Sequence, residues 1–499
     1  MDNIFNPKAE EENLASLEKL HAQSTTYPTL PTPELLATGS LSLVPSITNT
    51  RSEQDVIRHI TSDIVPAITG QALSPRYYGF VTGSSLPIAA WADTLVTRID
   101  QNVQVHLPHQ SIATEVEDRA LHMLGELLRL GDGFEGRTFT TGATGSNVLG
   151  LACGREAIIE KRGGNVGEDG LLGACMAAGI RNIQVLTSGG HSSLSKAASV
   201  VGLGRQSVKE LGVSADEPWK LDVDAVEAHL QKEGNATIIG ISAGEVNTGR
   251  FAVDGLAGMK RLRALADKYG AWIHVDGAFG IFARCLDEIA GFEDFKRQAE
   301  GIELADSITV DGHKILNVPY DCGMFFTRSQ STLPSVFANP NAAYLAGGSA
   351  SKISSPLNNG LENSRRFRAL PVYATLLSQG QNGFAAMISR MVLLARRIAG
   401  WIRASEQYDL LPGGDWDIEK ETFIIVLFRA RDNKSNENLV EKINATRQMY
   451  VSGTKWKGEK AVRIAVSTWK VDVERDGRIV EQILAAVAEG RDFELVQVK

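Results

Sequence analysis

Apolar and polar positions follow three different patterns along the chain, and these divide it into three parts. In residues 1–93, an amphipathic run from Ser52 to Ile68 has its apolar side chains at helical spacing, with Ser52 as the expected N-cap. Residues 94–371 alternate short β-rich runs with helical runs, and residues 372–499 begin with a long helical stretch. The pattern predicts an N-terminal arm packed on something larger, a large domain and a small C-terminal domain.

The large domain is predicted to have an α/β fold. Its clearest strands are expected at Ile183–Thr187, Ala236–Ala243, Trp272–Val275 and Ser307–Val310, with a helix at Gly255–Tyr269. Strands that alternate with helices form a mostly parallel sheet covered by helices on both faces. Ligands bind such sheets at the carboxyl ends of the strands, so the reactive residues are expected in the loops that follow them.

The C-terminal part is predicted to be a separate α+β domain. Its expected elements are a helix at Gln381–Ala404, strands at Phe423–Ala430 and Val462–Ala465, and a closing helix at Asp476–Gly490.

Charge and composition narrow the classes of function. The net charge of -8 over 499 residues argues against a nucleic-acid partner, which requires a basic surface. No apolar run reaches the ~18 residues that a membrane helix needs, and the N-terminus does not resemble a signal peptide, so a cytoplasmic location is expected. The four cysteines are scattered without a C-x-x-C pair, which predicts neither a disulfide framework nor a thiolate metal site.

The strongest chemical signal is Lys314, in the segment Asp311-Gly312-His313-Lys314 directly after a predicted strand. A lysine at the end of a buried strand is costly to hide as an ammonium ion, and formation of a Schiff base with a cofactor aldehyde removes that cost. A single lysine after a strand is more often a surface residue, so this signal needs support from other segments.

Three further segments supply that support. Asp276 ends the predicted strand at Trp272–Val275, where a carboxylate could pair with the ring nitrogen of pyridoxal 5′-phosphate (PLP). The segment Thr140–Asn147 runs into a helical stretch, as a phosphate-binding loop does. His191 follows another strand and could stack on the ring and transfer protons. Each segment alone is compatible with an ordinary turn, cap or structural histidine.

Taken in order, these four segments resemble the group II PLP-dependent decarboxylase family, which includes aromatic-L-amino-acid, histidine and glutamate decarboxylases. The resemblance extends from about Ser74 to the C-terminus. It implies a fold-type I architecture, in which a mostly parallel seven-stranded sheet has helices on both faces. It also implies a homodimer with the active site at the subunit interface.

The resemblance assigns roles to individual residues. Lys314 would form the Schiff base, Asp276 would pair with the pyridinium nitrogen, and His191 would stack on the ring. The other cofactor-binding positions that it implies are Thr144, Gly145, Thr248, Ala278, Asp311 and His313.

Catalytic and substrate-side positions are implied in the same way. Tyr344, on a loop rich in small and polar residues, falls where the family has a tyrosine that returns a proton to the α-carbon. The substrate side is expected at Phe80, Thr82 and His106. This chain departs from the family pattern at Gly277, where alanine is usual, and at Ile315, where many members have an aromatic residue.

The expected reaction is decarboxylation of an L-amino acid, with an aromatic amino acid as the first candidate. One alternative keeps PLP but cleaves a Cα–Cβ bond or yields an aldehyde, although Tyr344 argues against the aldehyde. The other is a non-catalytic paralogue that binds PLP or nothing. Because Lys314 and Asp276 are both present, the catalytic interpretation is favoured.

Overall fold

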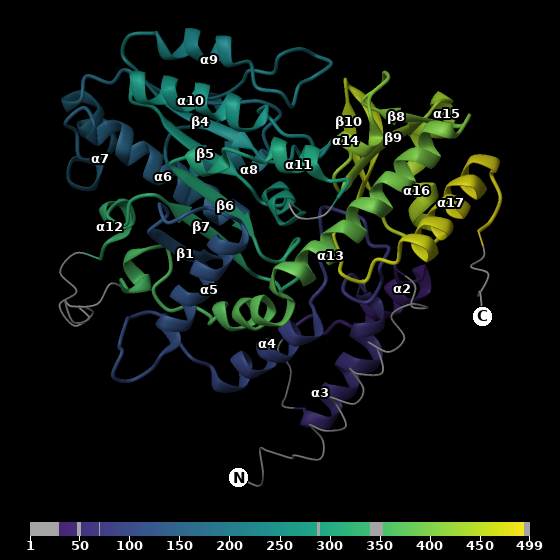
Figure 1. Ribbon diagram of the computed structural model, residues 1–499. Helices are drawn as coiled ribbons and strands as arrows, with labels where there is room; N and C mark the ends of the chain where they lie inside the picture. Colours follow the sequence, from purple (N-terminus) through teal and green to yellow (C-terminus); the bar gives the residue numbers. More distant parts are fainter. Residues whose placement is uncertain (1–28, 47–50, 69, 287–289, 340–352, 494–499) are drawn as a thin grey trace.

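The computed structural model of the protein describes residues 29–46, 51–68, 70–286, 290–339 and 353–493. Figure 1 shows a large α/β domain beside a smaller domain built from the C-terminal residues, with helices α2 and α3 projecting below them. None of the helices in the described part of the chain has both the length and the apolar character needed to span a bilayer.

A seven-stranded sheet forms the centre of the large domain. Its strands are β1 (Gly136–Thr140), β2 (Asn182–Thr187), β3 (Val208–Glu210), β4 (Asn235–Ser242), β5 (Trp272–Asp276), β6 (Ser307–Asp311) and β7 (Gly323–Thr327). Their order across the sheet is β1-β7-β6-β5-β4-β2-β3. The pairs among β6, β5, β4, β2 and β3 are parallel, and β7 runs antiparallel to both of its neighbours. The predicted mostly parallel sheet is confirmed.

Successive side chains on these strands enter two different hydrophobic cores, one on each face of the sheet. Ile273 belongs to the larger core, whereas its neighbour Trp272 belongs to the smaller one, and Phe326 and Phe325 divide in the same way. This alternation with a period of two residues is what a sheet covered on both faces requires.

Helices cover both faces of the sheet. The larger core includes residues of α4 (Pro87–Ile99), α5 (Ala113–Leu127), α9 (Val223–Leu230), α10 (Gly255–Tyr269), α11 (Glu293–Gln298) and α13 (Ala369–Ala404). The smaller core includes residues of α6 (Ala143–Glu160), α7 (Val166–Ala177), α8 (Ser192–Val200) and α12 (Thr332–Phe337).

The small domain is an antiparallel sheet with helices against it. Its strands are β8 (Tyr408–Leu411), β9 (Ile425–Ala430), β10 (Ser452–Trp456) and β11 (Glu459–Ala465), in the order β10-β11-β9-β8. Its helices are α14 (Ile418–Glu421), α15 (Asn433–Glu437), α16 (Leu439–Ala445) and α17 (Val473–Glu489). The predicted α+β domain is therefore present.

Helix α13 connects the two domains, packing against α4 and α5 at one end and α17 at the other. Gly380, with φ 54° and ψ −173°, interrupts its helical backbone. The helix predicted at Gln381–Ala404 is the part of α13 beyond this interruption. The expected boundary between residues 371 and 372 falls inside the first part of α13.

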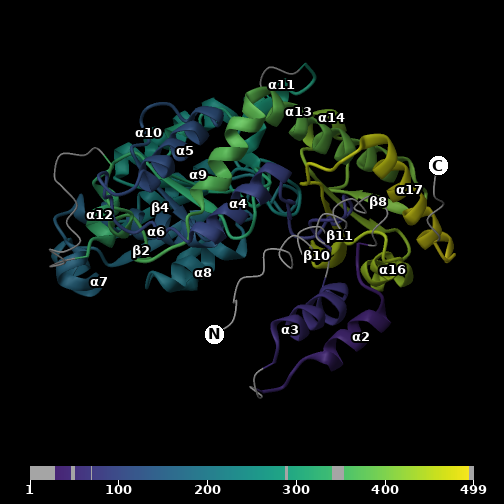
Figure 2. The same ribbon diagram turned by 90° about the horizontal axis from the view of Figure 1, so that it is seen from below.

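The N-terminal segment contains α2 (Pro33–Ser42) and α3 (Glu53–His59). The hydroxyl of Ser52 accepts a hydrogen bond from the Asp55 N–H, as the N-cap prediction requires. Beyond His59 the α-helix gives way to a π-helical turn and a short 3-10 turn that contains Pro66. The α-helix is therefore shorter than the amphipathic pattern, and Pro66, which has no N–H to donate, interrupts the helical hydrogen bonds before Ile68. Figure 2 shows α2 and α3 side by side, projecting away from the small domain.

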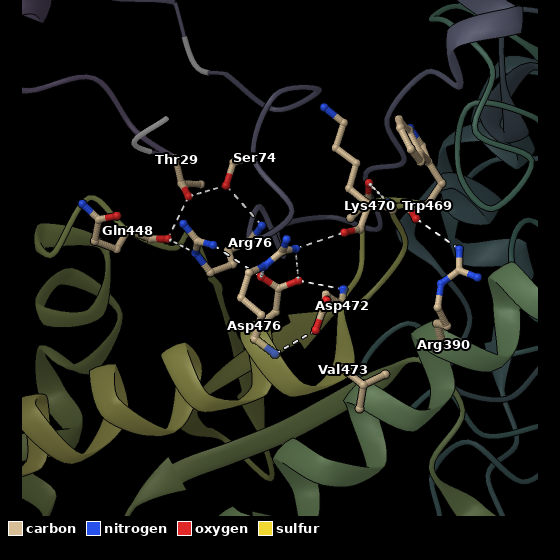
Figure 3. A network of polar contacts seen from close by, with 12 residues as sticks. Thr29, Ser74, Arg76, Arg390, Gln448, Trp469, Lys470, Asp472, Val473 and Asp476 are labelled. Atoms are coloured by element: carbon tan, nitrogen blue, oxygen red, sulfur yellow. Dashed lines mark hydrogen bonds and ion pairs between the residues drawn. The ribbon is translucent and has the colours of Figure 1, made fainter. Parts of the chain in front are cut away.

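After α3 the chain returns along the small domain, where a buried network holds it (Figure 3). Arg76 and Asp476 are both fully buried, and their charged groups lie 3.4 Å apart. Arg76 also donates from Nε to the carbonyl oxygen of Gln448 at 2.8 Å. The hydroxyls of Thr29 and Ser74 lie 2.7 Å apart beside this contact. The network anchors the segment that leads to residues 80–84.

Candidate active site

A cavity of about 600 Å3 lies at the carboxyl ends of the central parallel strands. It is bounded by the loops after β4, β5 and β6, by the start of α6 and by β11 of the small domain. The structure brings ten of the predicted site residues together around it: Phe80, Thr82, Thr144, Gly145, His191, Asp276, Ala278, Asp311, His313 and Lys314. The cavity thus lies at the edge of the sheet where ligands were expected to bind, at the carboxyl ends of the strands.

Lys314 lies one turn beyond the end of β6. Its Nζ is 3.4 Å from Oδ2 of Asp311, the last residue of that strand. Nε2 of His313 lies 3.1 Å from the other oxygen of the same carboxylate. Burial opposes the negative charge of Asp311, but the Lys314 ammonium and His313 outweigh it and hold the pKa of this carboxyl below its ordinary value. Asp311 therefore provides a fixed negative charge beside the lysine.

Asp276 lies at the end of β5 and lines the cavity. Its Oδ1 accepts a hydrogen bond of 3.2 Å from the backbone N–H of Ala278. Its Oδ2 accepts one of 2.9 Å from the side-chain amide of Asn147. Both oxygens are thus held by donors of the protein, and the carboxylate still lines the cavity.

The start of α6 can bind an anion. Ala143, Thr144 and Gly145 open this helix and line the cavity, and its N-cap residue, Gly142, has no side chain to cap it. Gly142, just before the helix, has φ 153°, and a Cβ there would approach the His313 ring. Free N–H groups and the positive end of the helix dipole attract a phosphate.

His191 follows β2 at the edge of the cavity. Its Nδ1 accepts a hydrogen bond from the backbone N–H of Ser193 at 3.1 Å, and the Ser193 hydroxyl lies 2.8 Å from the same nitrogen. Desolvation by the surrounding wall lowers the pKa of this imidazole, although the ring itself remains exposed to the cavity. Since Nδ1 is an acceptor, the neutral ring carries its proton on Nε2.

The substrate-side segment has an unusual backbone. Phe80 and Val81 are consecutive non-glycine residues with positive φ, 63° and 79°. Such conformations cost roughly 1–3 kcal/mol each and persist where the surrounding structure enforces them. Gly83 explains how close the segment lies to the lysine, because a Cβ at this position would collide with the Lys314 carbonyl oxygen.

Asn317 fixes this segment to the lysine loop and to the small domain. Its side-chain nitrogen donates to the carbonyls of Lys314 at 3.0 Å and Ser467 at 3.1 Å. Its side-chain oxygen accepts from the N–H groups of Ser84 at 3.3 Å and Trp469 at 2.9 Å. One buried amide thus connects three segments that are far apart in sequence.

Two residues of the cavity region were not identified as functional from the sequence. Arg463, on β11, lines the cavity and donates from Nη1 to the Val246 carbonyl at 2.8 Å. Its Nε has no hydrogen-bond partner in the described part of the chain. Asn147 belongs to the segment recognised as a phosphate loop, but no role was assigned to it. No local signal marks Arg463, since it lies within an ordinary strand.

Three predicted residues are not brought to this cavity. The hydroxyl of Thr248 donates to Glu245 at 2.8 Å, and Thr248 is not part of the lining. His106 is buried outside the cavity, where its Nδ1 lies 2.8 Å from the Thr114 hydroxyl. Tyr344 lies outside the described residues, and its role stays a prediction.

The arrangement fits PLP. The cavity places a lysine amine, a carboxylate held by two donors and an uncapped helix start around one space. These are the groups that the aldehyde, the ring nitrogen and the phosphate of the cofactor require. The small side chain of Ala278 leaves room for a flat ring beside the backbone.

Comparison with known proteins agrees with this chemistry. The pyridoxal-dependent decarboxylase conserved domain matches residues 41–431. L-2,4-diaminobutyrate decarboxylase of Acinetobacter baumannii is 29% identical over 399 residues, covering 76% of this chain and 73% of that protein. Tryptophan decarboxylase 1 of Oryza sativa subsp. japonica is 24% identical over 438 residues, covering 83% and 80%.

A solved structure shows the same fold. Oryza sativa TDC with PLP and tryptamine superimposes with a TM-score of 0.82 at 19% identity, covering 98% of this chain and 99% of that chain.

Proposed function

The chain belongs to the pyridoxal-dependent decarboxylase family and is a PLP-dependent amino-acid carboxy-lyase, and we propose that its substrate is an L-amino acid with an aromatic side chain. The observation that carries this proposal is the charge of the cavity lining. Its only described carboxylates are Asp276 and Asp311, and both already have partners in the protein. The aromatic rings of Phe80, Phe279 and Tyr320 lie in the same wall. A neutral aromatic side chain suits such a wall, whereas a cationic side chain requires a free carboxylate.

When bound, PLP would supply an aldehyde that captures amino groups and a ring that withdraws the electron pair left on the α-carbon when carbon dioxide departs. Lys314 is the residue that would hold the cofactor through its aldehyde carbon. The N–H groups at the start of α6 would hold its phosphate, and Asp276 would accept a hydrogen bond from its protonated ring nitrogen.

Two further residues would act on the substrate. Arg463 is a cation of the small domain that lines the cavity, and a guanidinium is suited to bind the α-carboxylate. Binding there would set the direction of the bond to be broken. His191 lines the cavity and can take part in proton transfer at the α-carbon after carbon dioxide leaves.

A homodimer is part of the proposal. Helices α2 and α3 and their flanking residues expose apolar side chains to solvent in the single chain: Leu35, Leu36, Leu41, Leu43, Val44, Val56, Ile60 and Ile68. Figure 2 shows these helices projecting from the body of the protein. An exposed apolar surface of this kind is typical of a protein–protein interface, and a second copy of the chain would cover it. A cytoplasmic location stays a prediction.

The proposal is tested by incubating the purified protein and PLP with aromatic, acidic and diamino acids, and by identifying products by mass spectrometry. We expect the amine of an aromatic amino acid, lighter than its substrate by one carbon dioxide. Lys314→Ala should abolish the product, and Lys161→Ala, an exposed lysine outside the cavity, should not. Turnover of a diamino acid or an acidic amino acid alone would refute the aromatic assignment and leave the family assignment intact.

A further inference from the structure

Asn147 occupies an unusual position behind the cofactor site. It lies in the second turn of α6, its side chain is fully buried, and all four of its hydrogen-bonding positions are used. The side-chain oxygen accepts from the Thr309 hydroxyl at 2.9 Å and pairs with Nε2 of His274 at 3.0 Å. The side-chain nitrogen donates to Oδ2 of Asp276 at 2.9 Å and to the Ser193 hydroxyl at 3.0 Å.

The direction of these hydrogen bonds is set at the far end of the network. The indole of Trp272 can only donate, and it donates to the Ser307 hydroxyl at 3.0 Å. That hydroxyl can then give its own proton to Nδ1 of His274, 2.8 Å away. His274 is fully buried, and this burial lowers its pKa to about 4, so the ring is neutral and carries its proton on Nε2. With the proton there, the side-chain oxygen of Asn147 faces His274, and the acceptor-only Asp276 carboxylate on the other side requires the same orientation.

The opposite orientation of the Asn147 amide is excluded by the same chain of contacts. It would place the amide oxygen 2.9 Å from the Asp276 carboxylate, where two acceptors repel each other. It would also direct an N–H at the protonated Nε2 of His274. Asn147 thus presents an N–H donor to Asp276 in one orientation only.

We propose that Asn147 is a positioning residue that holds the Asp276 carboxylate in a single orientation for the ring nitrogen of PLP. The amide N–H and the backbone N–H of Ala278 each occupy one carboxylate oxygen, which leaves the remaining lone pairs of Asp276 directed at the cavity. The second N–H of the same amide donates to Ser193, whose hydroxyl contacts Nδ1 of His191. One side chain therefore orders groups on both sides of the cofactor space.

This inference rests on the PLP dependence of the proposed function but not on the identity of the amino acid. Its test is accordingly the affinity of the apo-protein for PLP, measured by fluorescence titration at pH 6 and pH 8. The variants are Asn147→Leu, which has a similar shape and no hydrogen bonds, and Asn147→Asp, which keeps the size and the oxygen that faces His274. Thr375→Val is the matched control, because Thr375 is fully buried and its hydroxyl has no partner among the described residues.

We expect Asn147→Leu to weaken PLP binding about 10- to 100-fold at both pH values, the loss typical of one hydrogen bond to a charged group. Asn147→Asp should weaken it at least as much at pH 8, where the introduced carboxylate repels Asp276. At pH 6 the loss should be several-fold smaller, since a proton shared by two adjacent carboxylates replaces the missing N–H. Thr375→Val should stay within about twofold of the wild type.

Two results would overturn the proposal. One is an Asn147→Leu variant whose affinity for PLP is unchanged and in which only the melting temperature of the apo-protein is lowered. The other is an affinity loss in Asn147→Asp that is equal at the two pH values, because a purely structural role would not depend on a shared proton. Neither result depends on substrate turnover, so failure of the aromatic assignment would be seen separately.

Discussion

Removing one partner of the buried Arg76–Asp476 pair should destabilise the protein by very different amounts, depending on which partner is removed. Both side chains are fully buried. Asp476→Ala leaves the Arg76 guanidinium buried with the Gln448 carbonyl as its acceptor, and an uncompensated buried charge costs about 3–5 kcal/mol. Arg76→Met leaves Asp476 with other donors, namely Arg475 at 2.8 and 3.1 Å and the Asp472 N–H at 2.9 Å. Its expected cost is therefore only about 1–2 kcal/mol.

These costs convert to shifts in melting temperature. With about 2.1 cal/mol/K of unfolding entropy per residue, a chain of 499 residues loses ~1 kcal/mol of stability per degree near its Tm. Asp476→Ala should therefore lower the Tm by about 3–5 °C and Arg76→Met by about 1–2 °C in differential scanning calorimetry.

The double variant decides the interpretation. If the large effect of Asp476→Ala comes from the stranded charge of Arg76, removing both residues should lower the Tm by less than the sum of the two single shifts. The reasoning is refuted if the two shifts add, or if Arg76→Met is the more damaging of the two. Because the same network anchors the chain before Phe80, Arg76→Met should also raise KM while PLP affinity stays unchanged (Figure 3).

Four further predictions address the site and its surroundings. Lys314→Ala should remove the visible absorption band of the protein-bound cofactor without changing the circular dichroism spectrum of the apo-protein, and a retained band would contradict the assignment. Arg463→Met should raise KM about 10- to 100-fold in steady-state assays, with little change in PLP affinity, through loss of a charge-assisted contact to the α-carboxylate. Desolvation lowers the pKa of His191, so protonation of this ring below the ordinary value of 6.5 should place a new positive charge beside the cofactor and lower kcat/KM there, and His191→Gln should remove that acid limb from the pH profile. Burial lowers the pKa of Lys470 to about 8, so between pH 8 and 10.5 this lysine is protonated in the unfolded chain but not in the folded one, and the free energy of unfolding rises with pH over that range. Lys470→Met should therefore raise the Tm at pH 7, and this gain should shrink by pH 10.5.

Local patterns were sufficient to predict several elements accurately. Helix α10 begins at Gly255 and ends at Tyr269, as its periodicity predicts, and Gly270 ends it with φ 71°. Strand β5 starts at Trp272 and β6 at Ser307, each one residue longer than expected. These elements are specified by residues close together in sequence, so the signals that define them are local.

The expectation that ligands bind at the carboxyl ends of parallel strands also predicted where most of the candidate site lies. Asp276 and Asp311 end neighbouring strands β5 and β6, and Lys314 follows the second of them. Adjacent parallel strands bring their carboxyl ends to the same edge, so residues at those ends meet whatever the remaining topology is.

The sequence by itself therefore determined the α/β class, the carboxyl-end location of the chemistry and the residues that match the decarboxylase pattern. Tertiary structure alone decided that Arg463 of the small domain reaches the cavity, that His106 and Thr248 do not line it within this chain, and that Asn147 faces Asp276. The reason is physical. A strand or cap depends on neighbours a few residues away. The contacts of Asn147 with Asp276 and of Arg463 with Val246 join residues more than a hundred positions apart, and they exist only because the strand order and the docking of the two domains place them together.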